Sequence, residues 1–113
     1  MPLSVTFAHA TATGPRERNE DYGGFVAPAD PALTAAKGCL AALADGVSGG
    51  AHGREAAETA VRNLLRDYYS APDTWEIPRA LNSVLVAMNR WLAGQTASRR
   101  EPGGMATTLT CLA

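Results

Sequence analysis

The chain has 113 residues, an apolar content of 46% and a formal net charge of -1. This length suits one domain with a modest core, and the apolar content excludes a disordered chain. The lack of a basic excess argues against nucleic acid as a partner, and no apolar run approaches the roughly 18 residues of a membrane-spanning segment. The N-terminus lacks the pattern of a secretion signal. We therefore expect a cytoplasmic protein in which Cys39 and Cys111 are reduced, buried thiols.

The first half of the chain predicts short strands separated by turns. Loose alternation and β-branched residues favour strands, glycine and aspartate mark the ends of the third run, and clustered prolines favour a loop. We expect strands at Leu3 to Thr13, Tyr22 to Ala27 and Cys39 to Ala44, and a surface loop at Pro28 to Lys37.

The second half predicts two helices and a final strand. Apolar residues recur at steps of three and four from Ala56 to Tyr68, with Glu58 and Arg62 on the opposite side as a favourable pair. A second helix should begin near Pro78, which fits the first turn because its missing N–H costs little there. We expect this helix at Pro78 to Leu92, with Leu81, Val84, Leu85, Met88, Trp91 and Leu92 on its apolar face, a polar loop at Gly94 to Gly104, and a strand from Met105 onward.

Two short strings concentrate the residues that suggest chemistry: RERNED, beginning at Arg16, and ADGVSGG, beginning at Ala44. They contain the carboxylates of Glu20, Asp21 and Asp45, which would repel one another if the fold gathered them without a counter-charge. A hard divalent metal ion removes that repulsion and prefers oxygen ligands of this kind. Arg16 would then be free to hold an anion such as phosphate in its planar fork.

Each of these residues also has an ordinary structural interpretation. Glu20 and Asp21 could form a solvated acidic turn, or point to opposite faces if the backbone is extended. Arg16 could form a surface ion pair with Glu20 that contributes little stability. Asp45 could serve the turn before Gly46, and the glycines of this string could form a plain strand-to-helix turn instead of a loop that approaches a ligand.

Three motifs follow one another along the chain: RERNED at Arg16, ADGVSGG at Ala44 and GMATTL at Gly104. Together they resemble the metal-dependent Ser/Thr protein phosphatase family (PPM, type 2C). Its bacterial members carry Arg-x-x-Asn-Glu-Asp, Ala/Val-Asp-Gly-x-Gly-Gly and Gly-Met-Gly-Thr-Thr-Leu strings in this order. The second string has one extra residue before its glycine pair here, and the third differs only at Ala106. The resemblance covers essentially the whole chain and about the first half of the family's domain.

The resemblance implies a fold and an activity. The fold would be α+β, in the family a β-sandwich flanked by helices, with residues 1–113 forming the N-terminal part of one domain. The activity would be that of a protein serine/threonine phosphatase, which hydrolyses phosphoserine and phosphothreonine with a water activated by two Mn²⁺ or Mg²⁺ ions.

The resemblance also assigns roles to individual residues. Asp45 would bridge the two metal ions, and the Gly46 carbonyl would ligate one of them. Glu20 would hold a metal directly or through water, and Asp21 would support the catalytic water network. Arg16 would bind the substrate phosphate.

One departure from the family weakens the expectation of activity for these residues alone. The family places further metal-binding aspartates in the second half of its domain, and the sequence stops within an apolar strand at Ala113. We therefore expect a fragment of a longer protein, or alternatively a non-catalytic remnant or binding half-domain of the same fold. The expected partners are phosphorylated proteins, and a Ser/Thr kinase in the same pathway or chain is a further candidate.

Overall fold

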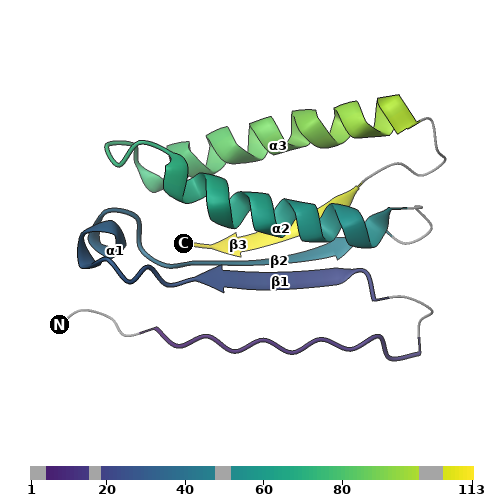
Figure 1. Cartoon of the computed structure of the whole chain (residues 1–113), viewed down its shortest axis with the longest axis horizontal. Coiled ribbons are helices and arrows are strands. Elements are labelled where there is room, and N and C mark those ends of the chain that lie inside the picture. Colours follow the sequence, from purple (N-terminus) through teal and green to yellow (C-terminus); the bar gives the residue numbers. More distant parts are fainter. Residues whose placement is uncertain (1–4, 16–18, 48–51, 100–105) are drawn as a thin grey trace.

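A sheet of three antiparallel strands, covered on one face by helices, organises the chain (Figure 1). The computed structural model describes residues 5–15, 19–47, 52–99 and 106–113. Along the chain, the elements are β1 (Asp21–Val26), α1 (Pro31–Lys37), β2 (Leu40–Gly46), α2 (Gly53–Ser70), α3 (Ile77–Arg99) and β3 (Thr107–Leu112). These elements confirm the α+β fold class expected from the sequence.

The order of strands in the sheet is β1-β2-β3, so β2 lies in the centre. Its buried and exposed residues alternate: Leu40, Ala42 and Ala44 are buried, while Leu43 is 53% exposed. This alternation is the period-two pattern of a strand with one covered face. The predicted strands at Tyr22 to Ala27, at Cys39 to Ala44 and after Met105 are confirmed, with boundaries shifted by one or two residues.

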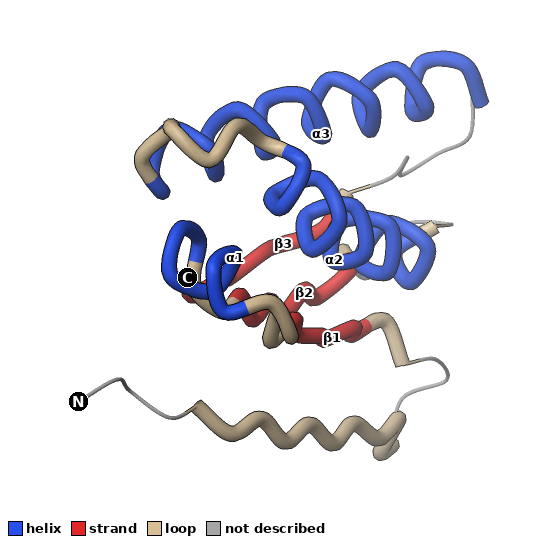
Figure 2. Tube along the Cα trace, turned by 60° about the vertical axis from the view of Figure 1, so that its left-hand side comes forward, coloured by secondary structure: helices blue, strands red, loops and turns tan. Residues whose placement is uncertain are grey.

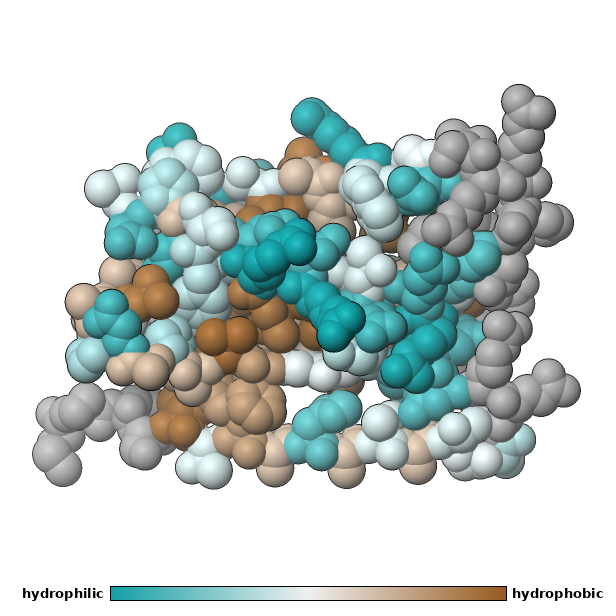
Figure 3. Space-filling model, viewed as in Figure 1, coloured by the Kyte–Doolittle hydropathy of each residue, from teal (hydrophilic) through white to brown (hydrophobic). Residues whose placement is uncertain are grey.

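The helix α2 supplies most of the cover for the sheet. It packs on all three strands, and its buried face consists of small and apolar residues at helical spacing. These residues are Gly53, Ala56, Ala57, Ala60, Val61, Leu64 and Tyr68. Its opposite face is hydrophilic (Figure 3) and carries the expected Glu58–Arg62 ion pair, with 3.6 Å between the charged atoms.

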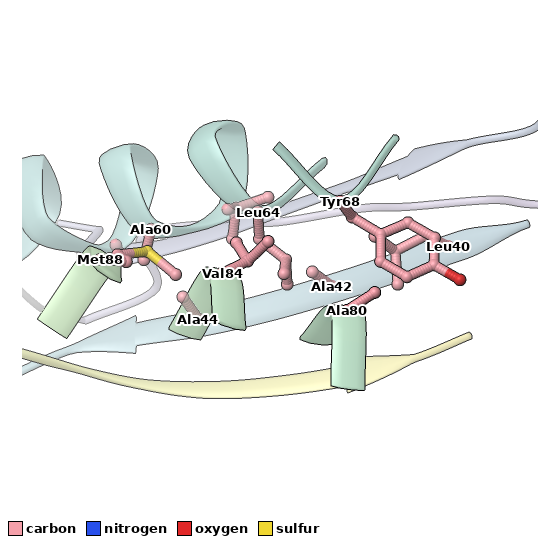
Figure 4. Close-up of a cluster of buried hydrophobic side chains, with 11 residues drawn as sticks. Leu40, Ala42, Ala44, Ala60, Leu64, Tyr68, Ala80, Val84 and Met88 are labelled. Atoms are coloured by element: carbon pink, nitrogen blue, oxygen red, sulfur yellow. The ribbon is translucent and has the colours of Figure 1, made fainter. Parts of the chain in front are cut away.

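The helix α3 packs against α2 and completes the core. Ala80, Val84 and Met88 are buried against residues of α2 and β2 (Figure 4). Leu81, Leu85 and Leu92 are partly buried beside them, as expected. The expectation for Trp91 is wrong, because this side chain is 44% exposed. Within the described residues, no helix is both long and apolar enough to cross a membrane.

The N-terminal segment, residues 5–13, is extended but is not a strand of the sheet, so the strand predicted at Leu3 to Thr13 is wrong for the described residues. No backbone hydrogen bond joins residues 5–13 to β1 among the described residues. Side chains hold the segment instead: Phe7 stacks on Phe25 with 4.4 Å between ring centroids, and His9 fills the space beside Gly23. Figure 2 shows the segment lying apart from the three strands.

The loop predicted at Pro28 to Lys37 is also wrong, because most of it forms the helix α1. The Asp30 carboxylate accepts a hydrogen bond from the Ala32 N–H at 2.9 Å and caps the first turn. Pro31 occupies the first helical position, where a proline needs no hydrogen-bond partner for its nitrogen. An aspartate followed by a proline therefore begins a helix here.

The helix α3 runs through part of the loop predicted at Gly94 to Gly104. Helical structure continues to Arg99, while residues 100–105 lie outside the described part of the chain. A glycine inside a helix costs about 1 kcal/mol relative to alanine. The cost of Gly94 is therefore too small to end this helix.

A cluster at the C-terminal end of α2 ties α1 to the core. The buried Lys37 ammonium donates to the main-chain carbonyls of Tyr68, at 2.8 Å, and Ala71. The Tyr68 hydroxyl donates in return to the Lys37 carbonyl at 2.7 Å, and the Tyr69 hydroxyl donates to the Gly38 carbonyl at 2.9 Å. The lysine thus satisfies carbonyls at the negative end of the helix dipole.

The environment of Tyr69 predicts a decline in stability at high pH. Burial, followed by the neighbouring charges of Tyr68 and Cys39, raises the pKa of Tyr69 from 10.0 to about 12. The unfolded chain loses this proton first, so the tyrosine's contribution is fully present below pH 10.0 and is lost as the pH rises to about 12. Tyr69→Phe should make the free energy of unfolding, measured by urea titration across this range, decline less steeply than in the wild type. Equal declines in the two proteins would contradict the assignment.

Candidate functional site

The two charged strings from the sequence meet at one end of the sheet. Asp21, the first residue of β1, is the cross-strand partner of Asp45 near the end of β2. The adjacent Gly46 N–H donates to the Glu20 carbonyl at 2.9 Å, which makes Glu20 and Gly46 a hydrogen-bonded pair. Asp21 and Asp45 therefore form the neighbouring non-hydrogen-bonded pair, in which side chains lie closest, with Cα atoms about 4.5 Å apart.

Both aspartates belong to the face of the sheet opposite α2, called the open face below. The open face carries Asp21, Gly23 and Phe25 from β1, Ala41, Leu43 and Asp45 from β2, and Thr108, Thr110 and Leu112 from β3. Asp21 and Asp45 are both exposed. Two like charges directly opposite one another destabilise a sheet unless a cation lies between them. On the other side of Asp45, the Thr108 hydroxyl donates to the Asp45 carbonyl at 3.3 Å.

Glu20 lies on the other side of the sheet, beside the beginning of α2. Its Oε2 atom is buried and has no hydrogen-bond partner among the residues that the structure describes. The same atom lies only 2.5 Å from the position that a Cβ atom on Gly53 would occupy. Glu20 and Asp21 thus point to opposite faces, as adjacent residues of an extended chain do. A buried carboxylate oxygen without a partner is costly, so this atom is a candidate for a ligand that supplies positive charge.

The end of β2 and the beginning of α2 are in direct backbone contact. A Cβ atom on Gly46 would collide with the Gly53 carbonyl, and one on Gly53 would lie 2.9 Å from the Val47 carbonyl. Gly46 belongs to β2 and not to a turn after it, so Asp45 is a strand residue as well. Gly49 and Gly50 lie outside the described residues, and their predicted part in a ligand-binding loop stays a prediction.

Asn19 and Arg54 complete the site, and sequence reasoning missed both. The Asn19 side chain accepts from the Asp21 N–H at 3.0 Å and donates to the Thr11 hydroxyl at 2.7 Å. It therefore fixes the start of β1 against the N-terminal segment. Arg54, near the start of α2, reaches the Asn19 carbonyl at 3.4 Å and lies over the Tyr22 ring, 5.6 Å from its centroid. A cation thus lies close to the acidic string, although the two are far apart in sequence.

The arrangement partly fits a divalent metal ion. Asp21 and Asp45 can share one cation on the open face, because their carboxylates belong to directly opposed residues. Across the described ranges, however, no three His, Cys, Asp or Glu side chains are grouped closely enough to hold a metal. Glu20 does not join the two aspartates as a third ligand, because its carboxylate lies on the helix side of the sheet. Arg16, the predicted phosphate ligand, falls outside the described residues.

Both cysteines lie away from this site. Cys39 and Cys111 are free thiols, and both are partly buried instead of fully buried as expected. Cys111, on the edge strand β3, pairs with Ala42, and Cys39 precedes β2 at the far end from Asp45. Neither cysteine is positioned to contribute a ligand to the acidic pair.

Comparison of the chain with protein-family models, with curated proteins and with solved structures finds no match. The function must therefore be argued from the motifs and the geometry of the site.

The close contact between the backbones of β2 and α2 predicts that replacing Gly53 with alanine destabilises the protein. Gly53→Ala should lower the free energy of unfolding by about 1–3 kcal/mol, because the new methyl group would crowd the Glu20 carboxylate and a main-chain carbonyl. Gly94→Ala is the matched control, since nothing lies within 4 Å of its added methyl group. That variant should instead gain up to about 1 kcal/mol from helix propensity. Urea denaturation of both variants measures the difference, and a Gly53→Ala protein as stable as the wild type would contradict the contact.

Proposed function

We propose that this chain is the N-terminal part of a PPM-type domain that acts as a protein serine/threonine phosphatase. The observation that carries the proposal is the pairing of two strings from separate parts of the sequence. Glu20 and Asp21 meet Gly46 and Asp45 as two adjacent cross-strand pairs, so the residues expected to surround the metals gather at one strand end. The proposed reaction, hydrolysis of phosphoserine and phosphothreonine, is inferred from the resemblance of the motifs to those of the PPM family.

The finer fold, a β-sandwich, is supported by the character of the open face. Phe25, Leu43 and Leu112 are 46%, 53% and 77% exposed there, although each lies on a regular strand. A contiguous apolar face on a sheet usually packs against another layer. Hydrophobic surface is also visible between α2 and the N-terminal segment in Figure 3. We propose that a second sheet covers this face in the complete domain.

The proposed cofactor is a pair of Mn²⁺ or Mg²⁺ ions. When bound, such ions supply a nucleophilic water near neutral pH and stabilise charge on the phosphoryl oxygens. Asp21 and Asp45 would hold one ion, and the Gly46 carbonyl is a further oxygen donor at the same strand end. Glu20, whose carboxylate lies on the helix side of the sheet, would hold a metal directly or through water from that side. In the family pattern the remaining metal-binding aspartates come from the second half of the domain, so we propose that they would complete the carboxylate set there.

The remaining residues of the site would bind and orient the substrate. Arg16 would hold the phosphate with its planar fork. Asn19 would keep Asp21 in place through the main-chain N–H. The substrates would be phosphorylated proteins in the cytoplasm, and a Ser/Thr kinase of the same pathway or chain would supply them. The role of Arg16 is carried over from the resemblance to the matching position in this sequence, whereas that of Asn19 rests on its hydrogen bond to Asp21.

A second candidate function is a non-catalytic half-domain that kept the fold and lost the reaction. The observation that favours it is the position of Glu20, whose carboxylate lies on the helix side and does not join the aspartate pair. In this case the acidic pair would have no catalytic role, and the surface of the domain would serve to bind a partner. Metal binding separates the two candidates.

Asp45→Asn should abolish both metal binding and activity, because it removes the charge opposite Asp21. Calorimetric titration with Mn²⁺ should show binding at micromolar concentration or tighter for the wild type and none for the variant. Asp67→Asn, which changes a half-buried aspartate on α2 away from the acidic pair, is the control and should bind as the wild type does. In the complete domain, hydrolysis of a phosphoserine peptide should fall more than about tenfold in Asp45→Asn. A wild type that binds no Mn²⁺ would favour the non-catalytic candidate.

Arg16→Ala should raise KM for a phosphoserine peptide, because a phosphate loses its charged partner. Arg54→Ala is an informative comparison, since Arg54 is already engaged with the Asn19 carbonyl and the Tyr22 ring. We expect a smaller change in KM for Arg54→Ala than for Arg16→Ala. Steady-state kinetics measure both variants, and an unchanged KM and kcat in Arg16→Ala would refute its role in phosphate binding.

A further inference from the structure

The outward face of α3 has an unusual charge pattern. The 23 residues of α3 include arginines but no aspartate or glutamate. The outer face of α3 is defined here by Arg79, Asn82, Ser83, Val86, Ala87 and Arg90, all of which are exposed. Together with Trp75 they line a hollow of about 450 Å³. An exposed, elongated hollow of one charge sign is the kind of surface that attracts an oppositely charged ligand.

The arginines of this face differ from those of the neighbouring helix. On α2, Arg62 pairs with Glu58 and Arg66 pairs with Asp67. On α3, neither Arg79 nor Arg90 forms an ion pair with any of the described residues. Arg62 and Arg66 are therefore balanced within the chain, while Arg79 and Arg90 remain available to a partner.

Arg79 stacks on an aromatic ring, although no acidic side chain of the described residues pairs with it. Its guanidinium carbon lies over the Trp75 ring, 4.1 Å from the centroid. Stacking uses the flat face of the guanidinium group, whereas its N–H donors lie in the plane of the group. The contact therefore reduces the freedom of the side chain and leaves its donors available for a carboxylate.

The spacing of the two arginines defines the shape of the ligand. They are separated by eleven positions, about three helical turns or 16 Å along the axis. Neutral side chains lie between them, and Val86 is 44% exposed in the middle. A complementary ligand therefore carries negative charge at two points about 16 Å apart and an apolar group between them.

We propose that the outer face of α3 is a docking site for an acidic segment of a partner protein, with two carboxylates three helical turns apart and an apolar side chain between them. Charge complementarity selects this occupant. A nucleic acid fits less well, because Asp73 and Glu76 are exposed just before α3 and would repel a continuous polyanion. The proposal depends on α3 and on Trp75, which precedes it, and does not rest on the phosphatase activity.

Fluorescence anisotropy tests this docking site directly. The probe is a labelled alanine-based helical peptide with two glutamates three turns apart and one leucine between them, and its counterpart has glutamine at both positions. The 113-residue chain should bind the glutamate peptide and not the glutamine peptide. The double variant Arg79→Glu/Arg90→Glu should bind at least about tenfold more weakly at low salt.

A charge-matched control separates the docking site from a general effect of net charge. Arg62→Glu/Arg66→Glu makes the same change on the exposed face of α2 and should leave binding within about twofold of the wild type. Circular dichroism confirms that both double variants are folded. In the wild type, the peptide should shift the amide resonances of Ser83, Val86 and Ala87.

Three outcomes would overturn the proposal. The first is the absence of binding to the glutamate peptide, and the second is an equal loss of binding in the two double variants. The third is tighter binding of an oligonucleotide or of phosphatidylserine vesicles, with the same dependence on Arg79 and Arg90. That result would assign the face to a nucleic acid or to a membrane surface instead of an acidic protein segment.

Discussion

The close approach of two glycines, Gly46 at the end of β2 and Gly53 at the start of α2, sets the position of the main helix on the sheet. Their backbones touch because neither residue has a side chain. From this point α2 continues across the strands with Ala56, Ala57 and Ala60 against the sheet, and these small residues keep the helix close. The larger Leu64 and Tyr68 fill the wider space toward the other end of α2 (Figure 4). The packing of the helical layer therefore begins at the same strand end as the candidate site.

The pairing of the strands explains why acidic and apolar residues share the open face. A strand alternates its side chains between two faces, so the register that buries Ala42 and Ala44 under α2 must expose Leu43 and Asp45. A shift by one residue would bury Asp45 and expose the core, which the hydrophobic effect strongly disfavours. The position of Asp45 opposite Asp21 is thus set by the core on the other side of the sheet. Stability and the candidate chemistry depend on the same register.

Sequence reasoning predicted the elements whose signal is local and periodic. It failed where the structure of a segment depends on contacts with a distant part of the chain. The spacing in α2 and the run that forms β2 carried their own signals, whereas α1 was missed because its prolines were interpreted only as helix breakers. Whether residues 5–13 form a strand depends on hydrogen bonds to β1, which no local pattern specifies. The motifs predicted the meeting of Asp21 and Asp45. The sequence left open that Glu20 and Asp21 point to opposite faces, as they do, but it did not predict that Glu20 would lie against α2 or that Arg54 would reach the same site.

The distribution of charge matters more for this chain than its total. A net charge of -1 conceals an acidic pair on the open face and two arginines on the outer face of α3, Arg79 and Arg90, that form no ion pair with the described residues (Figure 1). Because screening limits the interaction of exposed charges to about 10 Å at moderate salt, the two surfaces act on ligands independently. A cation attracted to Asp21 and Asp45 would not compete with the arginines, and an acidic segment on α3 would not be repelled by the aspartates. The helical layer thus allows one small domain to present two surfaces of opposite charge.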